Sequence, residues 1–458
     1  MKNIFFTTCF LLLCLSGCDS FTEVELPNSQ LTSDAVFEDK ATADAAMADI
    51  YTKIRDNGLL TGNSWGISNQ LGLYGDELDF YGNPLDGSLA FYNNALLASS
   101  TEVADMWNNS YNQIYAANAV IEGVAKSASL AQADKDRLTG EVLFVRALVH
   151  FYLLQCFGDI PYVTTTDYNV NRSVSRQPES IVYGLLMADL EQAVSFLPED
   201  YNGANRVRPN KWAATALLSR VYLYEGLWAE ASNAASAVLN QTGLYGVETD
   251  LDRTFVIASK STIWQLMANS AGGNTYEAQT FIFFSGPPTV SALTPNLMAA
   301  FEPGDQRKAH WTKEVTGENG EAFYHAYKYK EDSSTGSSKE YSVVLRIGEL
   351  YLIRAEARAQ QGELIDAKED LDIIRSAAGL SPTTAVTQTD ILNAILAERR
   401  VELFTEYGHR FFDLKRADKL DAVLPLTKPG WDSSDRLFPI PATEILRNRN
   451  LAPQNAGY

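Results

Sequence analysis

Few residues of this 458-residue chain have the type and spacing that catalysis requires. The stretch GDELDF contains Asp76, Glu77 and Asp79, and a pair of carboxyl groups is what a glycoside hydrolase uses to cleave a glycosidic bond. Such an enzyme needs the two groups at a set separation across a sugar ring, and neighbouring acids in one loop do not specify that geometry. We favour an acidic loop that is solvated or orients ligand hydroxyl groups, with a glycoside hydrolase as the alternative.

Motifs of other common chemistries are absent from the sequence. It has no phosphate-binding loop, no dinucleotide-binding glycine fingerprint and no His-Glu-x-x-His zinc helix. Its four histidines, His150, His310, His325 and His409, are far apart along the chain and are interpreted as structural or solvent-facing. We therefore expect no catalytic residue, no cofactor and no metal ligand.

Three of the four cysteines lie within the first 18 residues. Lys2 and the apolar residues 4–15 are typical of a secretory signal peptide, because a membrane-spanning helix needs about 20 residues. Residues 1–17 are therefore predicted to be a signal peptide. The sequence Leu15-Ser16-Gly17-Cys18 resembles the lipobox of bacterial lipoproteins, in which the cysteine is acylated. The alternative is an ordinary secretory signal with an incidental cysteine.

Removal of the signal peptide leaves only Cys18 and Cys156. No disulfide framework and no cysteine-based zinc site is then possible, and Cys156 is expected to be a small buried residue in a helix. The net charge of −20 disfavours nucleic acid and anionic lipid headgroups as partners. We expect an exported protein that is attached to a membrane by its lipidated N-terminal end.

Apolar residues at helical spacing dominate the chain and predict a mainly α fold. The predicted helices lie within residues 32–58, 100–127, 134–158, 179–197 and 387–418. Residues 59–100 lack a clear helical period, and residues 241–345 are rich in loop-forming residues, with short strands expected near 263–266 and 323–330.

Two further segments share a spacing that is typical of tetratricopeptide-like helical hairpins. In each, a turn glycine is followed by small or apolar residues at offsets of five, nine and twelve, which would let paired helices approach closely. The two sets are Gly226 with Ala231, Ala235 and Val238, and Gly362 with Ala367, Leu371 and Ile374. Two ordinary helical hairpins are the alternative interpretation.

The predicted organisation is a signal peptide, a tether and one compact domain. Residues 18–33 are polar and are expected to form the lipidated tether. The domain spans residues 34–458, with an N-terminal helical half at 34–240, a loop-rich insert at 241–345 and a C-terminal helical part with an extended tail at 346–458. The charged residues between Arg399 and Asp413 are expected to form a partly buried ion-pair network that fixes the C-terminal helix against this tail.

Aromatic residues in the irregular segments are the best candidates for ligand contacts. A flat ring can cover the apolar C–H face of a sugar while neighbouring amides and carboxylates bind its hydroxyl groups. The predicted ligand-binding residues are Trp65, Tyr74, Asp76, Tyr81, Asn83, Tyr92, Tyr276, Trp311 and Tyr324.

The chain resembles the SusD/RagB family of nutrient-binding outer-membrane lipoproteins. Five stretches carry the resemblance, at residues 18–51, 141–163, 350–380, 398–418 and 437–458. The tail departs from the family pattern at Arg449 and Ala456, where proline is usual.

This resemblance implies a helical body with four tetratricopeptide-like hairpins, and a ligand site on irregular loops, here 65–93 and 274–324. It implies a lipid-anchored protein on the cell surface that covers a SusC-like TonB-dependent transporter in the outer membrane. Such a protein captures an oligosaccharide, or in some members a peptide, and passes it inward unchanged. A pure protein scaffold built on the hairpins is a further alternative.

Overall fold

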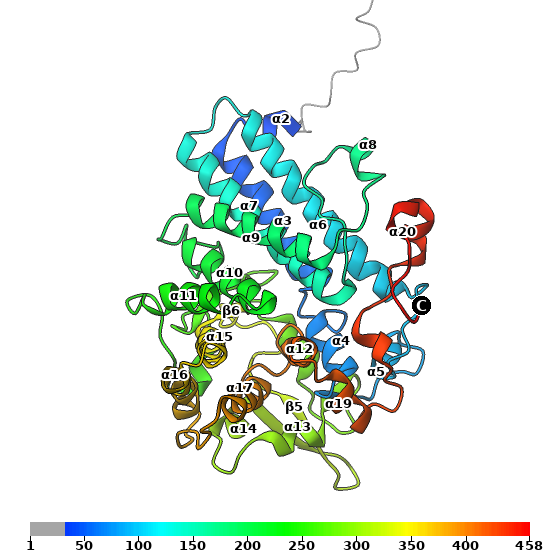
Figure 1. Cartoon of the computed structure of the whole chain (residues 1–458), viewed down its shortest axis with the longest axis vertical. Helices are drawn as coiled ribbons and strands as arrows, with labels where there is room; N and C mark the ends of the chain where they lie inside the picture. The colour runs from blue at the N-terminus through cyan, green and yellow to red at the C-terminus, as the bar shows by residue number, and fades with distance from the viewer. Residues whose placement is uncertain (1–32) are drawn as a thin grey trace, which may run out of the picture.

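The computed structural model describes residues 33–458. The predicted signal peptide, Cys18 and the tether up to residue 32 lie outside the described residues. The body is mostly helical, as predicted, and the helices follow one another from α6 and α7 at the top of Figure 1 to α15 and α16 at the lower left. The helices are α2 (Ser33–Val36), α3 (Lys40–Asp56), α4 (Ile67–Tyr74), α5 (Ser88–Tyr92), α6 (Thr101–Lys126), α7 (Gln132–Phe157), α8 (Tyr168–Asn171), α9 (Glu179–Phe196), α10 (Lys211–Glu225), α11 (Trp228–Leu239), α12 (Tyr276–Phe281), α13 (Pro295–Ala300), α14 (Gln306–Trp311), α15 (Ile347–Gln360), α16 (Leu364–Ala377), α17 (Gln388–Glu402), α18 (His409–Arg416), α19 (Leu420–Val423) and α20 (Ala442–Arg447), with 3-10 turns η2 (Leu251–Arg253), η3 (Leu424–Leu426), η4 (Ser433–Arg436) and η5 (Arg449–Leu451).

Helix α7 forms the centre of the N-terminal half. Its apolar residues are buried by α6 on one side and α9 on the other, and it ends at Gly158, whose φ of +71° is readily adopted by glycine. Within residues 33–458 it is the one helix long and apolar enough to cross a bilayer, but its apolar window lies wholly inside the protein. Cys156 is buried near its end, as expected.

The two helical hairpins that the glycine spacing predicts are present. Helices α10 and α11 meet at Gly226 and α15 and α16 meet at Gly362, with φ of +76° and +83°. The residues at the predicted offsets are all buried, and α11 packs against α15, so hairpins far apart in sequence are stacked. Small side chains at the contact allow this close approach.

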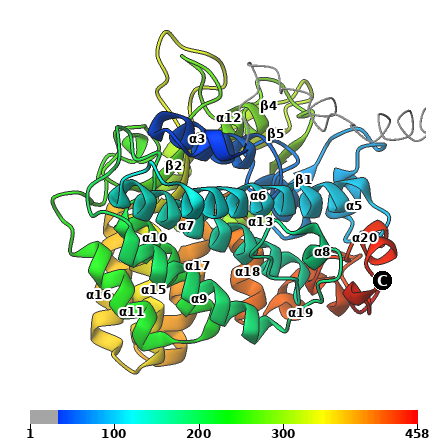
Figure 2. The same cartoon turned by 90° about the horizontal axis from the view of Figure 1, so that it is seen from above.

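The described part of the chain has three two-stranded antiparallel sheets, and the insert contributes to each of them. The pairs are β1 (Leu78–Phe80) with β3 (Ser291–Leu293), β2 (Thr262–Leu266) with β6 (Ser342–Arg346), and β4 (Thr312–Thr316) with β5 (Ala322–Ala326). The strand expected near 263–266 is therefore present, whereas the one expected at 323–330 ends at Ala326. Figure 2 shows α12, β4 and β5 along one edge of the molecule and α11, α15 and α16 along the opposite edge.

Two helices lie in the region 59–100, where no helical period is visible in the sequence. All eight residues of α4 are buried, including Asn69 and Gln70, whose amide groups donate hydrogen bonds to the Ser64 carbonyl at 2.9 and 2.7 Å. A helix that is buried on every side shows no alternation between polar and apolar faces. Periodicity could not reveal α4 for this reason.

The predicted ion-pair network around α17 and α18 is present, but its partners differ from those expected. Arg399 pairs with Asp413 at 2.7 Å within this segment. Arg410 binds Asp76 of the N-terminal half at 2.8 Å, and Glu406 binds Arg346, the last residue of β6, at 2.8 Å. The network therefore joins three distant parts of the chain rather than fixing a helix against the tail.

Candidate ligand-binding site

A tight turn between α3 and α4 presents Trp65 to solvent. The Trp65 N–H donates to Asn63 Oδ1 at 2.9 Å, and the buried amides of α4 hold the Ser64 carbonyl. A Cβ atom at Gly66 would lie 1.7 Å from the Thr61 carbonyl oxygen, so only glycine fits there. The turn is thus held in one conformation, with the Trp65 side chain 45% exposed.

A cavity of about 230 Å³ lies beside this ring and is called the Trp65 cavity below. It is below the usual 300–1,000 Å³ of a small-molecule pocket, so it would hold only part of an extended ligand. No lysine or arginine lines it, and its polar groups are carboxylates, amides and one hydroxyl. The lining residues are Asp56, Asn57, Gly58, Thr61, Asn63, Trp65, Glu102, Asp105, Met106 and Asn109.

Tyr276 reaches the same place from the insert. Its hydroxyl donates to Asp56 Oδ1 at 3.1 Å and accepts a hydrogen bond from Asn269 Nδ2 at 2.9 Å. Asp56 lines the Trp65 cavity, so Tyr276 contacts a residue of this cavity although Tyr276 itself does not line it. The first and second predicted loops therefore meet there.

A second surface, the Tyr81 face, comprises Tyr81, Asn83 and Tyr92 beside β1, whereas Tyr324 of β5 points to the opposite face of its strand from Phe323, the residue that contacts Tyr81. The Tyr81 ring is 38% exposed and contacts Phe323 edge-on at a centroid distance of 5.4 Å. The Asn83 side chain is exposed, and the Tyr92 and Tyr324 hydroxyls bond to carboxylates. A Cβ atom at Gly87 would lie 2.0 Å from Glu102 Oε1, so the loop after Tyr81 touches a residue of the Trp65 cavity. The two candidate surfaces are neighbours.

Two side chains outside the predicted ligand-binding set are Phe284, one of the loop aromatics, and Lys428, which sequence reasoning missed. Phe284 lies in one of the aromatic-rich loops and is 74% exposed. Lys428 places its Nζ 3.8 Å from the centroid of the Tyr92 ring, and burial lowers the pKa of this ammonium to about 8 despite the nearby Asp79 carboxylate. Nothing in the local sequence around Lys428 indicates that it returns to residues more than 300 positions earlier.

Three of the predicted ligand-binding residues are buried, and their prediction was wrong. Tyr74 packs among aromatic rings in the core and donates its hydroxyl hydrogen bond to the Asp435 carbonyl at 2.9 Å. Trp311 donates from Nε1 to the Leu251 carbonyl at 3.1 Å and is 1% exposed. Asp76 is also 1% exposed, since it is enclosed by its ion pairs.

The acids of GDELDF do not form a pair that could face a substrate. Burial raises the pKa of Asp76, but the hydrogen bond and charge of Arg410 and the charge of Arg400 outweigh burial, so this pKa lies below its usual range. Burial raises the pKa of Glu77 to about 8, and Glu77 is 2% exposed. Among residues 33–458, no group of three or more His, Cys, Asp or Glu residues is arranged to hold a metal ion.

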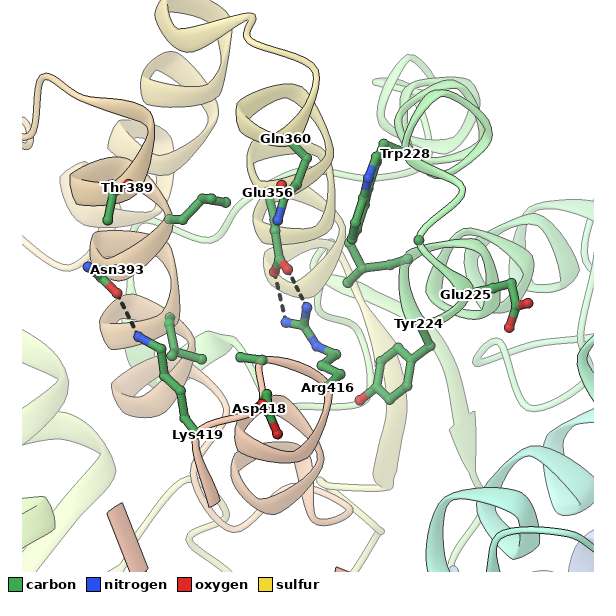
Figure 3. Close-up of a pocket in the computed structure, with 15 residues that line it drawn as sticks. Tyr224, Glu225, Trp228, Glu356, Gln360, Thr389, Asn393, Arg416, Asp418 and Lys419 are labelled. Atoms are coloured by element: carbon green, nitrogen blue, oxygen red, sulfur yellow. Dashed lines mark hydrogen bonds and ion pairs between the residues drawn. The ribbon is translucent and has the colours of Figure 1, made fainter. Parts of the chain in front are cut away.

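A larger cavity of about 710 Å³ lies on another part of the molecule, between the α10–α11 hairpin, α15, α17 and the end of α18 (Figure 3). None of the predicted ligand-binding residues lines it. It is larger than the Trp65 cavity, but most of the predicted residues that remain exposed lie at the Trp65 cavity and the Tyr81 face. We therefore treat those two surfaces as the principal candidate site.

Stacked helical hairpins that carry irregular, aromatic-rich loops define the class of fold to which this chain belongs. Two family models match this chain: one described as "Starch-binding associating with outer membrane" matches residues 82–223, and that of the SusD family matches residues 296–458. Together these matches span well over half of the sequence. The chain belongs to the SusD family, which confirms the resemblance seen in the sequence.

Curated relatives agree with this assignment. SusD-like protein P2 of Formosa agariphila is 26% identical, with all of both chains covered. SusD-like protein P25 of the same organism is 23% identical over 98% of this chain and 97% of that one.

Solved structures share the fold. A SusD superfamily protein from Bacteroides vulgatus superimposes with a TM-score of 0.81 at 21% identity, covering 92% of this chain and 99% of that chain. A laminarin-binding SusD-like protein gives a TM-score of 0.75 at 24% identity, covering 91% and 99%. The architecture is thus the SusD fold.

Proposed function

We propose that this protein captures an oligosaccharide at the Trp65 cavity and the adjoining Tyr81 face without cleaving it. The observation that carries the proposal is the exposed indole of Trp65 beside a cavity lined by amides and carboxylates and free of cationic side chains. The starch-binding description of one matched family model and the laminarin-binding relative support a saccharide ligand.

Binding at this site follows from the chemistry of the two surfaces. The indole face covers the C–H groups of a sugar ring, and this contact removes apolar area from water. The side chains of Asn63 and Asn109 can donate and accept hydrogen bonds, and the Asp56 and Asp105 carboxylates accept them from hydroxyl groups. Because the Trp65 turn is held rigidly, little conformational entropy is lost when the ligand binds.

The proposal places the protein at the surface of the outer membrane, anchored by lipid on Cys18. The matched family description associates such proteins with the outer membrane. A SusC-like TonB-dependent transporter is the proposed partner that receives the oligosaccharide. Co-purification of such a barrel with the tagged protein from solubilised outer membranes would support this part, and its consistent absence would contradict it.

Capture without cleavage is tested by incubating the purified protein with maltooligosaccharides and laminarioligosaccharides. Equilibrium dialysis should show retention of at least one of them, and chromatography should recover it at its original length. Shortened products would support the glycoside hydrolase alternative. Retention of peptides in place of both sugars would support the peptide-binding alternative.

A further inference from the structure

The larger cavity lies between helices that are far apart in sequence. Trp228 and Tyr224, from the α10–α11 hairpin, stand on one side, and Thr389 and Asn393 of α17 stand on the other (Figure 3). Between them, Arg416 donates a hydrogen bond to Glu356 at 2.8 Å. The volume of about 710 Å³ is within the range of small-molecule pockets.

Two aromatic side chains are held firmly in this cavity. A Cβ atom at Gly226 would lie 3.5 Å from the Trp228 ring, so the indole packs against the backbone of the hairpin turn. The Arg416 guanidinium lies 5.5 Å from the centroid of the Tyr224 ring and braces it. Trp228 and Tyr224 both remain half-buried and line the open space.

Several polar groups of the cavity have unused hydrogen-bonding capacity. Within residues 33–458, the side chains of Gln360 and Thr389 and the hydroxyl of Tyr224 have no hydrogen-bond partner in the protein. Asn393 accepts one hydrogen bond, from Lys419 Nζ at 2.6 Å, and its amide N–H groups remain free to donate. The wall therefore offers amides and hydroxyl groups, which can both donate and accept.

The charges in the cavity nearly cancel. Arg416 neutralises the charge of Glu356. The remaining charged side chains of the cavity are the two anions Glu225 and Asp418 and the cation Lys419. The cavity therefore has no large net charge that would attract a strongly anionic or cationic ligand. A purely apolar ligand would leave the polar groups of the cavity without hydrogen-bond partners. A neutral ligand that carries many hydroxyl groups satisfies both conditions.

The backbone of the cavity does not suit a peptide. The walls are helices, whose backbone groups bond internally, so there is no strand edge that an extended peptide could join. An amphipathic helix would need a continuous apolar groove, and the Arg416–Glu356 ion pair with Asp418 and Lys419 interrupts the apolar side chains of this wall.

We propose that this cavity is a second saccharide-binding site, which holds a short neutral oligosaccharide against Trp228. The ligand class follows from the side chains of this cavity, so the inference does not rest on the function proposed for the Trp65 cavity. The protein would then bind saccharide on the hairpin side as well as on its loop side.

The test is a ligand-observed NMR titration of the full chain with maltotriose and with laminaritriose, in a Trp65→Ala background that weakens the first site, so that the effect of a further substitution at the second cavity can be measured. We expect at least one trisaccharide to bind this variant. Adding Trp228→Ala should weaken that binding about fivefold or more, which corresponds to the loss of one stacked ring. The matched control adds Tyr168→Ala, which removes an exposed aromatic residue of α8, and should leave the affinity unchanged.

Gln360→Ala provides a second readout, because this side chain has no partner within the described residues and its loss should not disturb folding. It should also weaken trisaccharide binding in the Trp65→Ala background. Failure of both trisaccharides to bind the Trp65→Ala protein would overturn the inference. Affinity that is unchanged by Gln360→Ala and by a folded Trp228→Ala variant would overturn it as well. The proposed function is tested separately, by comparing the oligosaccharide affinity of the wild-type protein with that of Trp65→Ala.

Discussion

Trp65 combines a substantially exposed side chain with a backbone turn that is held by hydrogen bonds. Hydrogen bonds to Asn63 and Ser64 fix the turn, while nearly half of the indole side chain faces solvent. A ligand that covers this exposed aromatic area removes it from water, and this burial stabilises the complex.

Trp65→Ala should therefore weaken oligosaccharide binding by about 1 kcal/mol or more, the value of a stacked ring. The free energy of unfolding should change little, because the side chain contributes little to the core. Calorimetric titration and urea unfolding measure the two effects. Tyr168→Ala is the matched control, and an equal loss of affinity in both variants would contradict the assignment of the site to Trp65.

Glu77 gives a prediction for stability as a function of pH. Burial, with the nearby charge of Asp76, raises its pKa from 4.5 to about 8, so the folded protein keeps a proton that the unfolded chain releases between these values. The unfolded state then binds fewer protons, and this group lowers the stability as pH rises through that window.

Glu77→Gln removes this titration. The variant should gain stability relative to wild type between pH 5 and pH 9, by up to about 4 kcal/mol at about 1.4 kcal/mol per pKa unit. Urea unfolding at both pH values measures the difference. Glu318→Gln, at an exposed glutamate, should leave the pH dependence unchanged. A Glu77→Gln curve parallel to that of wild type would show that the carboxyl group is already ionised in the folded protein.

The exposure of single aromatic residues could be predicted only in part. Trp65, Tyr81 and Tyr276 lie where a ligand could reach them, whereas Tyr74 and Trp311 fill the core. All five come from segments that were expected to be irregular, and in such segments no period distinguishes an inward from an outward side chain.

At the scale of elements, helices with one apolar face could be located from the sequence, because their periodicity reports directly on burial. The hairpins at Gly226 and Gly362 are the clearest case, since a left-handed turn residue and small buried side chains have local signatures. Helix α4 lacked such a signature because the protein surrounds it completely. This helix nevertheless holds the turn that presents Trp65.

Gly66→Ala tests the role of that turn. Its added Cβ atom would clash with the Thr61 carbonyl oxygen, so the turn must move and displace Trp65. Affinity for the oligosaccharide should fall at least as far as in Trp65→Ala, and stability should fall by about 1–3 kcal/mol.

Gly184→Ala is the matched control, because a Cβ atom at this position in α9 meets no atom within 4 Å. It should leave binding unchanged and stabilise the helix slightly. Normal affinity in Gly66→Ala would show that the site does not depend on the geometry of the turn.

At the scale of the whole molecule, buried ion pairs join segments that the sequence presents as separate. The charged residues of α17 and α18 could be recognised as a network, but their partners Asp76 and Arg346 lie far away along the chain. Long-range pairing depends on the tertiary fold, which no local pattern records. The resemblance to the SusD family supplied the overall architecture that local reasoning could not.

Membrane attachment is the prediction that belongs to the whole protein. Cys18→Ala should move the protein from the membrane fraction to the soluble fraction, because each buried methylene of an acyl chain contributes about 0.8 kcal/mol to attachment. Immunoblots of separated fractions measure the change. Cys14→Ala, within the predicted signal peptide, is the control and should remain with the membrane. Membrane retention of Cys18→Ala would contradict the lipid anchor.

The most direct test of the central claim is a crystal structure of the protein with a bound maltooligosaccharide or laminarioligosaccharide. We predict an intact sugar chain with one ring against the Trp65 indole and hydroxyl groups within hydrogen-bonding distance of Asn63 or Asn109. A saturated complex in which no sugar ring contacts Trp65, or in which the chain is cleaved, would contradict the account.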